Sequence, residues 1–142
     1  MCQPYSQCNS CIKQCLLTFL FGILGTVLDG EMVLDNDPAT GMKIPRYLIY
    51  DIISLFKDGK QQDVGNCNFN TRLECIQREI VNPRNKLIQE GQIHKESEPF
   101  RIRIKQFWDI TETKTLLGPK FTKEQLGHEP DGLIFQPVDH VS

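Results

Sequence analysis

Two short acidic motifs with a glycine are the residues of this sequence best suited to chemistry. Asp29, Gly30 and Glu31 lie at the start of one apolar stretch, and Asp131 and Gly132 lie at the start of another. A glycine lets the backbone come close to a ligand, and a neighbouring carboxylate can then face a cleft beside the strand. The motifs therefore predict a phosphate-binding site with a metal ion.

The overall composition is that of one soluble globular domain or a piece of a larger one. The chain has 142 residues, 39% of them hydrophobic, and a formal net charge of -2. This apolar content is too high for a disordered chain. The charge argues against a stand-alone nucleic-acid-binding domain, because such domains usually carry a basic excess that neutralises phosphates. A small nucleotide held through a metal ion requires no such excess.

The first 25 residues differ from the rest. Four of the six cysteines lie among the first fifteen residues: Cys2, Cys8, Cys11 and Cys15. No second pair of ligands follows at zinc-finger spacing, so a zinc site is disfavoured. The apolar stretch 15–28 is shorter than the roughly 20 residues that cross a bilayer. A core segment or an unrelated leader is favoured over a signal-like segment or a membrane anchor. We therefore expect a leader over residues 1–25, a body over residues 26–142 and no membrane partner.

Residues 28–35 alternate between apolar and acidic side chains and predict a strand. The apolar face, expected in the core, carries Leu28, Met32 and Leu34. The acidic face, expected in solvent, carries Asp29, Glu31 and Asp35. Residues 45–55 follow after a run of turn-forming residues and predict a second strand, buried on both faces except at Asp51. The two strands are expected to form a hairpin.

The middle of the chain predicts a turn and two helices. Residues 57–60 are typical of a turn, and Thr71 and Glu74 have the spacing of a capping box that opens a helix. Apolar residues then recur at helical spacing: Leu73, Ile76, Ile80 and Val81. Pro83 is expected to end this helix. Residues 82–92 are expected to hold another short helix that ends near Gly91.

Three further elements are predicted after residue 99. Residues 100–108 begin with strict alternation and predict a strand whose inward side chains are Phe100, Ile102 and Ile104. Its outward side chains are Arg101, Arg103 and Lys105, which could guide phosphates or RNA but are more often solvated surface. A short helix is expected over residues 122–126 and a final strand over residues 131–135.

Four segments in this order resemble the guanylyltransferase domain of metazoan-type mRNA capping enzymes: residues 28–35, 45–53, 70–80 and 131–137. That domain belongs to the covalent nucleotidyltransferases, together with ATP-dependent DNA and RNA ligases. The resemblance implies an α+β fold of the DNA-ligase-like, ATP-grasp-like kind. We expect a mainly antiparallel sheet around a nucleotide cleft, with flanking helices, in an incomplete copy of the domain.

The resemblance also implies a two-step reaction. A lysine attacks the α-phosphate of GTP to form lysyl-GMP, and GMP then passes to the 5′-diphosphate end of RNA, with Mg²⁺ or Mn²⁺ as cofactor. By this resemblance Glu31 would contact the ribose or a metal-bound water, Asp131 would hold the metal, and Tyr50 would stack on the purine. Gly30 and Gly132 would complete the nucleotide-binding set. A nuclear location and the phosphorylated tail of RNA polymerase II as a possible partner are implied in the same way.

The family's lysine nucleophile is missing from this sequence. It belongs to a Lys-x-Asp-Gly motif ahead of Asp29, and the only similar run, Lys57 to Gly59, is one residue short and follows Tyr50. The chain is therefore expected to be catalytically incomplete, with no catalytic residue of its own. Two other functions stay open, a ligase-like adenylyltransferase piece and a non-catalytic interaction module of the capping machinery. Plain structural roles also stay open: Glu31 as a solvated carboxylate, Asp131 as a turn residue and Tyr50 as a core residue.

Overall fold

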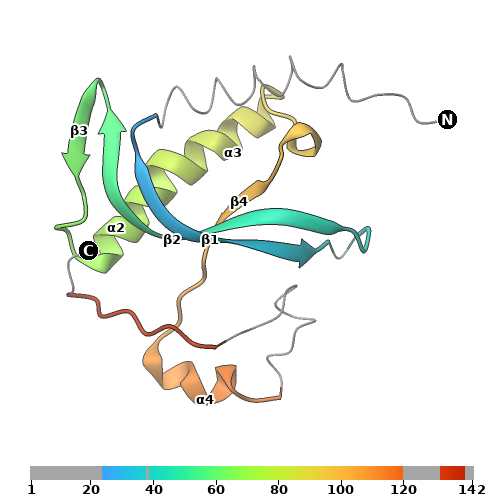
Figure 1. Ribbon diagram of the computed structural model, residues 1–142, viewed down its shortest axis with the longest axis vertical. Coiled ribbons are helices and arrows are strands. Elements are labelled where there is room, and N and C mark those ends of the chain that lie inside the picture. Colours follow the sequence, from blue (N-terminus) through green and yellow to red (C-terminus); the bar gives the residue numbers. More distant parts are fainter. Residues whose placement is uncertain (1–23, 38, 120–131, 140–142) are drawn as a thin grey trace.

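The computed structural model describes residues 24–37, 39–119 and 132–139. One sheet and a long helical segment across it form a two-layer α+β fold (Figure 1). The predicted fold class is therefore confirmed. Within the described ranges, no helix has both the length and the apolar character needed to cross a membrane.

The central strand of the sheet is also its longest. Strand β2 (Lys43–Lys57) pairs antiparallel with β1 (Val27–Asn36) along one edge. Along its other edge, β2 pairs antiparallel with β3 (Lys60–Asp63) and parallel with β4 (Arg101–Ile104). The predicted hairpin of the first two strands is confirmed. The predicted strand over residues 100–108 is also present, but it is shorter and ends at Ile104.

A two-residue turn joins β2 to β3. Asp58 and Gly59 both have positive φ, 52° and 74°, as a type I′ hairpin turn requires, and Asp-Gly is a favoured pair at these positions. The predicted turn is therefore confirmed, whereas β3 was not predicted. All four residues of β3 are exposed, so it lacks the apolar alternation that signals a strand.

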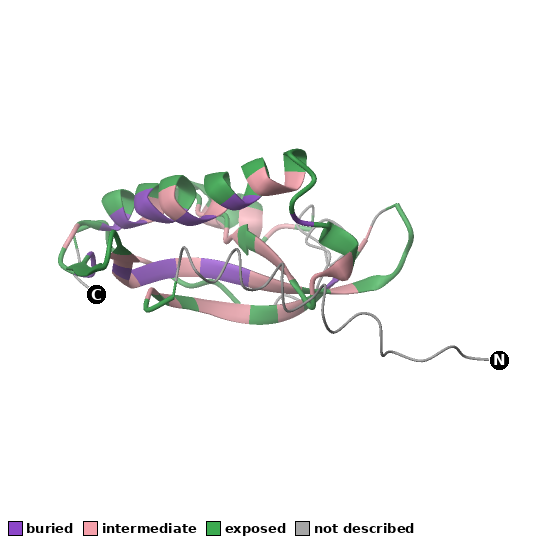
Figure 2. Cartoon of the chain, turned by 90° about the horizontal axis from the view of Figure 1, so that it is seen from above, coloured by how far each residue is buried: buried purple, intermediate pink, exposed green. Residues whose placement is uncertain are grey.

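A continuous helical segment covers one face of the sheet (Figure 2). Its parts in order are α2 (Phe69–Ile76), a π-helical turn (Gln77–Val81) and α3 (Asn82–Gln89). The predicted capping box is wrong, because Asn68 is the N-cap and its side chain accepts a hydrogen bond from the Thr71 N–H at 2.9 Å. The predicted stop at Pro83 is wrong too. The wider π-helical turn directly before Pro83 accommodates a residue that lacks an N–H, so the helix continues. The second helix ends before Gly91, as expected.

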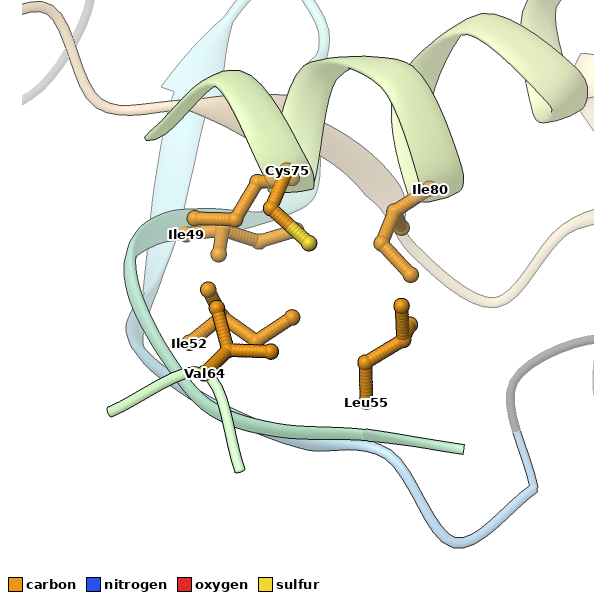
Figure 3. Packing of buried hydrophobic residues seen from close by; sticks show 7 residues of the cluster. Ile49, Ile52, Leu55, Val64, Cys75 and Ile80 are labelled. Carbon is orange, nitrogen blue, oxygen red and sulfur yellow. The ribbon is translucent and has the colours of Figure 1, made fainter. Parts of the chain in front are cut away.

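The core lies between β2 and the helical segment (Figure 3). Its buried residues are Ile49, Ile52, Leu55, Val64, Cys75, Ile76 and Ile80. Leu73 and Val81 pack against this cluster, so the helical periodicity predicted from residue 71 is confirmed. Ile102 and Ile104 pack there as well, as predicted. Phe100 does not, because it is exposed directly before β4, where its ring makes an edge-on contact with Tyr47.

The predicted burial of four strand residues is wrong. Met32 and Leu34 are exposed, because the end of the β1–β2 hairpin extends past the helices (Figure 2). Asp35 is buried at 4% exposure, where it contacts Arg46 and Arg103. Asp51 is buried as well. Both buried strand carboxylates lie next to arginines, which neutralise their charge.

The chain after β4 forms short helical turns and irregular backbone. A 3₁₀ turn (Ile110–Glu112) leads into α4 (Thr113–Leu116). Residues 132–135 form no strand, so the predicted final strand is wrong for these residues, which pair with no described strand. Segment 132–139 instead returns to α2, where the Val138 carbonyl accepts a hydrogen bond from the Phe69 N–H at 2.9 Å (Figure 1). Asp131 and the helix predicted over residues 122–126 lie outside the described residues.

Candidate functional site

Tyr50 occupies an irregular position in the central strand. The pairing of β1 with β2 steps from Asp29–Asp51 to Gly30–Ile49, so Tyr50 is the extra residue of a β-bulge. A bulge bends its strand and redirects a side chain, and bulges are common next to active sites. The backbone therefore turns the Tyr50 ring away from the regular alternation of the strand.

Gly30 makes the close packing beside this bulge possible. A Cβ atom at Gly30 would lie 2.5 Å from the Leu48 carbonyl oxygen and 2.7 Å from Tyr47 Cζ. Both distances are too short for nonbonded atoms, so any side chain would push β1 and β2 apart. The close backbone approach expected at this glycine therefore serves Tyr47 and Leu48. The expected contact between Gly30 and a nucleotide stays a prediction.

Lys105 connects Glu31 with Tyr50. Its Nζ donates a hydrogen bond to Glu31 Oε1 at 2.6 Å and lies 5.7 Å from the centre of the Tyr50 ring. The backbone N–H of Lys105 donates to the Ile49 carbonyl at 2.7 Å, which fixes this residue beside β2. The Lys105 and Glu31 side chains are 30% and 34% exposed. Solvent therefore reaches this group, and an aromatic ring, a carboxylate and an ammonium are available to a ligand together.

Burial and nearby carboxylates keep Tyr50 neutral. The pKa of Tyr50 is raised above its ordinary value first by desolvation, then by the charge of Asp29 and a hydrogen bond with its carboxylate, and then by the charge of Glu31. The pKa of Tyr47 is raised by burial first and by Asp29 and Tyr50 after it. Both causes disfavour the phenolate. The Tyr50 ring therefore stays uncharged and suited to stacking at physiological pH.

Arg72 attaches helix α2 to β2 directly after Tyr50. The Arg72 side chain is fully buried, and its Nε and Nη2 donate to the two Asp51 oxygens at 2.7 and 3.0 Å. Its Nη1 donates to the Cys67 carbonyl at 2.6 Å. A two-pronged contact of this kind fixes orientation as well as distance. The ion pair therefore holds the strand beside the bulge against the helix.

Three arginines continue the basic side of the site. Arg46 of β2 is the register partner of Arg101 of β4, and Arg103 lies two residues before Lys105. Arg46 Nε lies 2.7 Å from Asp35 Oδ2, a charge contact outside hydrogen-bond geometry, and no described residue accepts a hydrogen bond from this buried N–H. Arg103 Nη2 is 3.9 Å from the same Asp35 oxygen. Desolvation is the first cause that lowers the pKa of Arg46, and the Arg103 and Arg101 charges lower it further against the opposing effect of Asp35.

Comparison with known proteins identifies the family. The family described as "mRNA capping enzyme, catalytic domain" matches residues 12–141. The chain belongs to this mRNA capping family. Across 113 residues it is 51% identical to the mRNA-capping enzyme of Mus musculus and 50% identical to that of Danio rerio. Across 117 residues it is 36% identical to the mRNA-capping enzyme of Caenorhabditis elegans.

These capping enzymes are much longer than the chain. The matched segments cover 80% of this chain and 18% of the Mus musculus and Danio rerio proteins. The chain thus spans about a fifth of the length of these relatives. The boundary expected at residue 26 stays a prediction.

The structure brings together two of the expected capping-site residues. Glu31 and Tyr50 lie close together, joined by Lys105. Gly132 is exposed and lies in irregular backbone. Asp131 falls outside the described residues, so its meeting with Glu31 and Tyr50 stays a prediction.

The described residues do not by themselves make a metal site. No group of three or more His, Cys, Asp or Glu side chains that could hold an ion occurs within them. Glu31 is instead paired with Lys105, whose positive charge opposes a cation at the same oxygen. The metal role expected for Glu31 and Asp131 therefore remains a prediction that depends on Asp131.

Sequence reasoning missed the parts that Lys105 and Asp29 play. Alternation correctly placed Lys105 on the face opposite Ile104, but its contact with Glu31 depends on the register of β4 beside β2. Asp29 was expected in solvent, and it is indeed exposed. Its effect on the pKa of Tyr50 depends on the bulge, and the pattern of apolar residues does not reveal a bulge.

Proposed function

We propose that this chain forms part of the guanine-nucleotide site of an mRNA capping guanylyltransferase. The observation that carries the proposal is the meeting of Tyr50, Glu31 and Lys105 at the bulge of β2. Membership of the capping family supports GTP as the ligand. The activity proposed for the longer protein is transfer of GMP from a lysine to the 5′-diphosphate end of RNA.

Each of the three side chains has a role in this proposal. Tyr50 stacks on the purine, which is worth about 1–3 kcal/mol by analogy with bases stacked on aromatic side chains. The Lys105 ammonium has only donors. Guanine offers the acceptors O6 and N7 along one edge, whereas adenine replaces O6 with an amino donor. Lys105 therefore favours GTP over ATP, and Glu31 orients Lys105 and accepts from a ribose hydroxyl.

Further parts of the proposal rest on the family. Glu31 and Asp131 would hold Mg²⁺ or Mn²⁺, which when bound neutralises charge on the phosphates. Gly30 and Gly132 complete the nucleotide-binding set. RNA with a 5′-diphosphate, the phosphorylated tail of RNA polymerase II and a nuclear location complete the expected setting.

Nucleotide selectivity tests the binding proposal. Labelled GTP should bind the purified chain and be displaced more readily by GTP than by ATP. Tyr50→Ala should weaken GTP binding by about 5- to 150-fold, the equivalent of the stacking energy above. Lys105→Met should reduce the preference for GTP, and Lys60→Met on β3 is the matched control.

Two outcomes of this experiment would favour the alternatives. Equal displacement by ATP and GTP would favour a ligase-like adenylyltransferase. Binding of phosphorylated polymerase-tail peptides without any nucleotide binding would favour a non-catalytic interaction module.

The covalent step is tested separately. The sequence has no Lys-x-Asp-Gly motif, so we expect no lysyl-GMP on the 142-residue chain. Incubation with α-phosphate-labelled GTP and a divalent metal, followed by denaturing electrophoresis, should leave the protein unlabelled. A labelled band would show that another lysine serves as the nucleophile.

A further inference from the structure

We propose that Arg46, Arg101 and Arg103, the arginine row, bind backbone phosphates of single-stranded RNA beside the nucleotide site. The inference rests on the proposed function, because the row is an extension of the same sheet face. It adds a binding surface for the RNA strand to a site that the function above assigns to GTP.

The register of the sheet creates the row. Arg46 and Arg101 are register partners in the parallel pair of β2 and β4, so their Cα atoms lie about 4.8 Å apart. Arg103 follows on the same face, and Lys105 after it reaches Glu31 beside Tyr50. Arg46 precedes Tyr50 by four residues, which is roughly 13 Å along a strand. The basic side chains thus lead directly to the ring proposed to stack a base.

The row holds more positive charge than its neighbours neutralise. Like charges directly opposite each other destabilise a sheet, and Arg46 and Arg101 are such a pair. Asp35 contacts both Arg46 and Arg103, and the charge of Asp37 acts on Arg46 and Arg101, so two carboxylates face three guanidinium groups. Among the described residues, Arg101 makes no ion pair, and the Arg103 side chain is 48% exposed. Guanidinium donors are therefore available to an incoming anion, whose charge would relieve the repulsion.

An RNA strand fits these features better than a phosphorylated peptide. Proteins bind single strands by combining a basic track for the phosphates with aromatic rings for the bases. The arginine row and Tyr50 supply both parts on one face. A phosphopeptide would use the arginines but would leave the adjacent ring without a role. Substitution of Tyr50 should therefore affect the binding of RNA but not of a phosphopeptide, whereas substitution of the arginines should affect both.

Salt-dependent binding of RNA tests the proposal. The probe is a fluorescently labelled 12-mer of oligouridylate, followed by anisotropy between 50 and 200 mM salt. Each phosphate contact should contribute a slope of about -0.7 in log K against log salt for a single strand. R101E and R103E should each weaken binding at 50 mM salt by about tenfold and reduce the slope by about one contact. Lys60→Glu, the same charge change on β3, should leave binding unchanged.

Several results would overturn the arginine row. Equal losses in Lys60→Glu would indicate general attraction rather than a site. Wild-type binding by both R101E and R103E would exclude the row, and so would a phosphoserine peptide that binds there when the RNA does not. R101Q and R103Q, with circular dichroism of every variant, separate loss of charge from loss of folding. If the charge-reversed and the charge-neutral variants are folded and bind RNA like the wild type, the proposal is contradicted.

GTP binding by the same variants separates this inference from the proposed function. R101E should retain its affinity for GTP, and Y50A should lose GTP while the salt slope for RNA stays largely intact. If RNA binding depends on the row but GTP does not bind, the guanine site is wrong and the row stands. If GTP binding depends on Tyr50 but RNA binding does not depend on the arginine row, the guanine site stands and the arginine row is wrong.

Discussion

At the scale of single residues, Gly30 and Tyr50 together determine the shape of the candidate site. The glycine lets β1 approach Tyr47 and the Leu48 carbonyl. The tyrosine is the residue that β2 adds opposite this point. The geometry of the site thus depends on the lack of a side chain at Gly30 and on the redirected side chain of Tyr50.

Gly30→Ala should destabilise the protein. The new Cβ would overlap the Leu48 carbonyl at 2.5 Å, and overpacking of this kind typically costs about 1–3 kcal/mol. Urea unfolding followed by circular dichroism measures the loss. Gly41→Ala is the control with open space around its Cβ, so its cost should be limited to the strain of a positive φ, about 1 kcal/mol. An equal or smaller loss for Gly30→Ala would contradict the packing described at the bulge.

The titration of Tyr50 reports on its carboxylate neighbours. In a Y5F/Y47F background Tyr50 is the single tyrosine, and its phenolate can be followed by ultraviolet absorbance. Its pKa should lie above the ordinary value of about 10, because desolvation comes first and Asp29 and Glu31 act after it. Asp29→Asn should lower this pKa part of the way back.

The sign of the corresponding stability effect follows from the same shift. The folded state favours the neutral phenol, so this contribution is fully present below the unfolded pKa of about 10 and is lost as pH rises through the higher folded value. Stability above pH 10 should therefore fall. A Tyr50 pKa that Asp29→Asn leaves unchanged would place Asp29 away from the ring.

At the scale of elements, the Arg72–Asp51 ion pair joins α2 to β2. Both side chains are buried, and the pair lies directly beside the bulge. The core cluster holds the same two elements together through apolar contacts. Apolar packing leaves freedom to slide, whereas a two-pronged ion pair admits one orientation. The register of helix on strand is thus determined by the charged pair.

Arg72→Met should cost about 3–5 kcal/mol of the free energy of unfolding, because Asp51 would remain buried without its partner. The double variant D51L/R72M should recover part of that loss, since it leaves no unpaired charge. Chemical denaturation of the single and double variants measures both values. Lys86→Ala, which removes an exposed contact with Glu90, should change stability by less than about 1 kcal/mol. If Arg72→Met lowers the free energy of unfolding no more than this control does, the ion pair is not formed in solution.

At the scale of the whole molecule, segments that are far apart in the sequence contact α2. The Phe69 ring packs edge-on against Phe107 with centroids 4.7 Å apart, and the Phe69 N–H bonds to Val138. The irregular segment after β4 and segment 132–139 thus meet at the first turn of α2. This contact places the Gly132 end of the expected capping motif within the same fold as the strands.

Phe69→Ala should therefore destabilise the protein by about 3–5 kcal/mol. Phe69 is 4% exposed, whereas Phe135 is 61% exposed, and Phe135→Ala should stay within about 0.5 kcal/mol of the wild type. Thermal and urea unfolding compare the two. Equal losses for the two variants would contradict the burial of Phe69 described here.

The sequence by itself determined the hairpin of β1 and β2, the Asp-Gly turn and the apolar face of the helical segment. These features follow from local preferences: strand alternation, helical spacing and turn residues act over a few neighbouring positions. The family resemblance also came from the sequence, because four motifs in order specify more than any one of them.

The tertiary structure alone decided where the charged residues act. Asp51 and Asp35 are buried because arginines from other elements meet them, and Pro83 stays within a helix because a π-helical turn precedes it. Lys105 reaches Glu31, and Tyr50 leaves the regular alternation, through strand register and a bulge. Apart from the π-helical turn before Pro83, these features depend on pairing between distant segments, and a short window of sequence contains only one side of each pair.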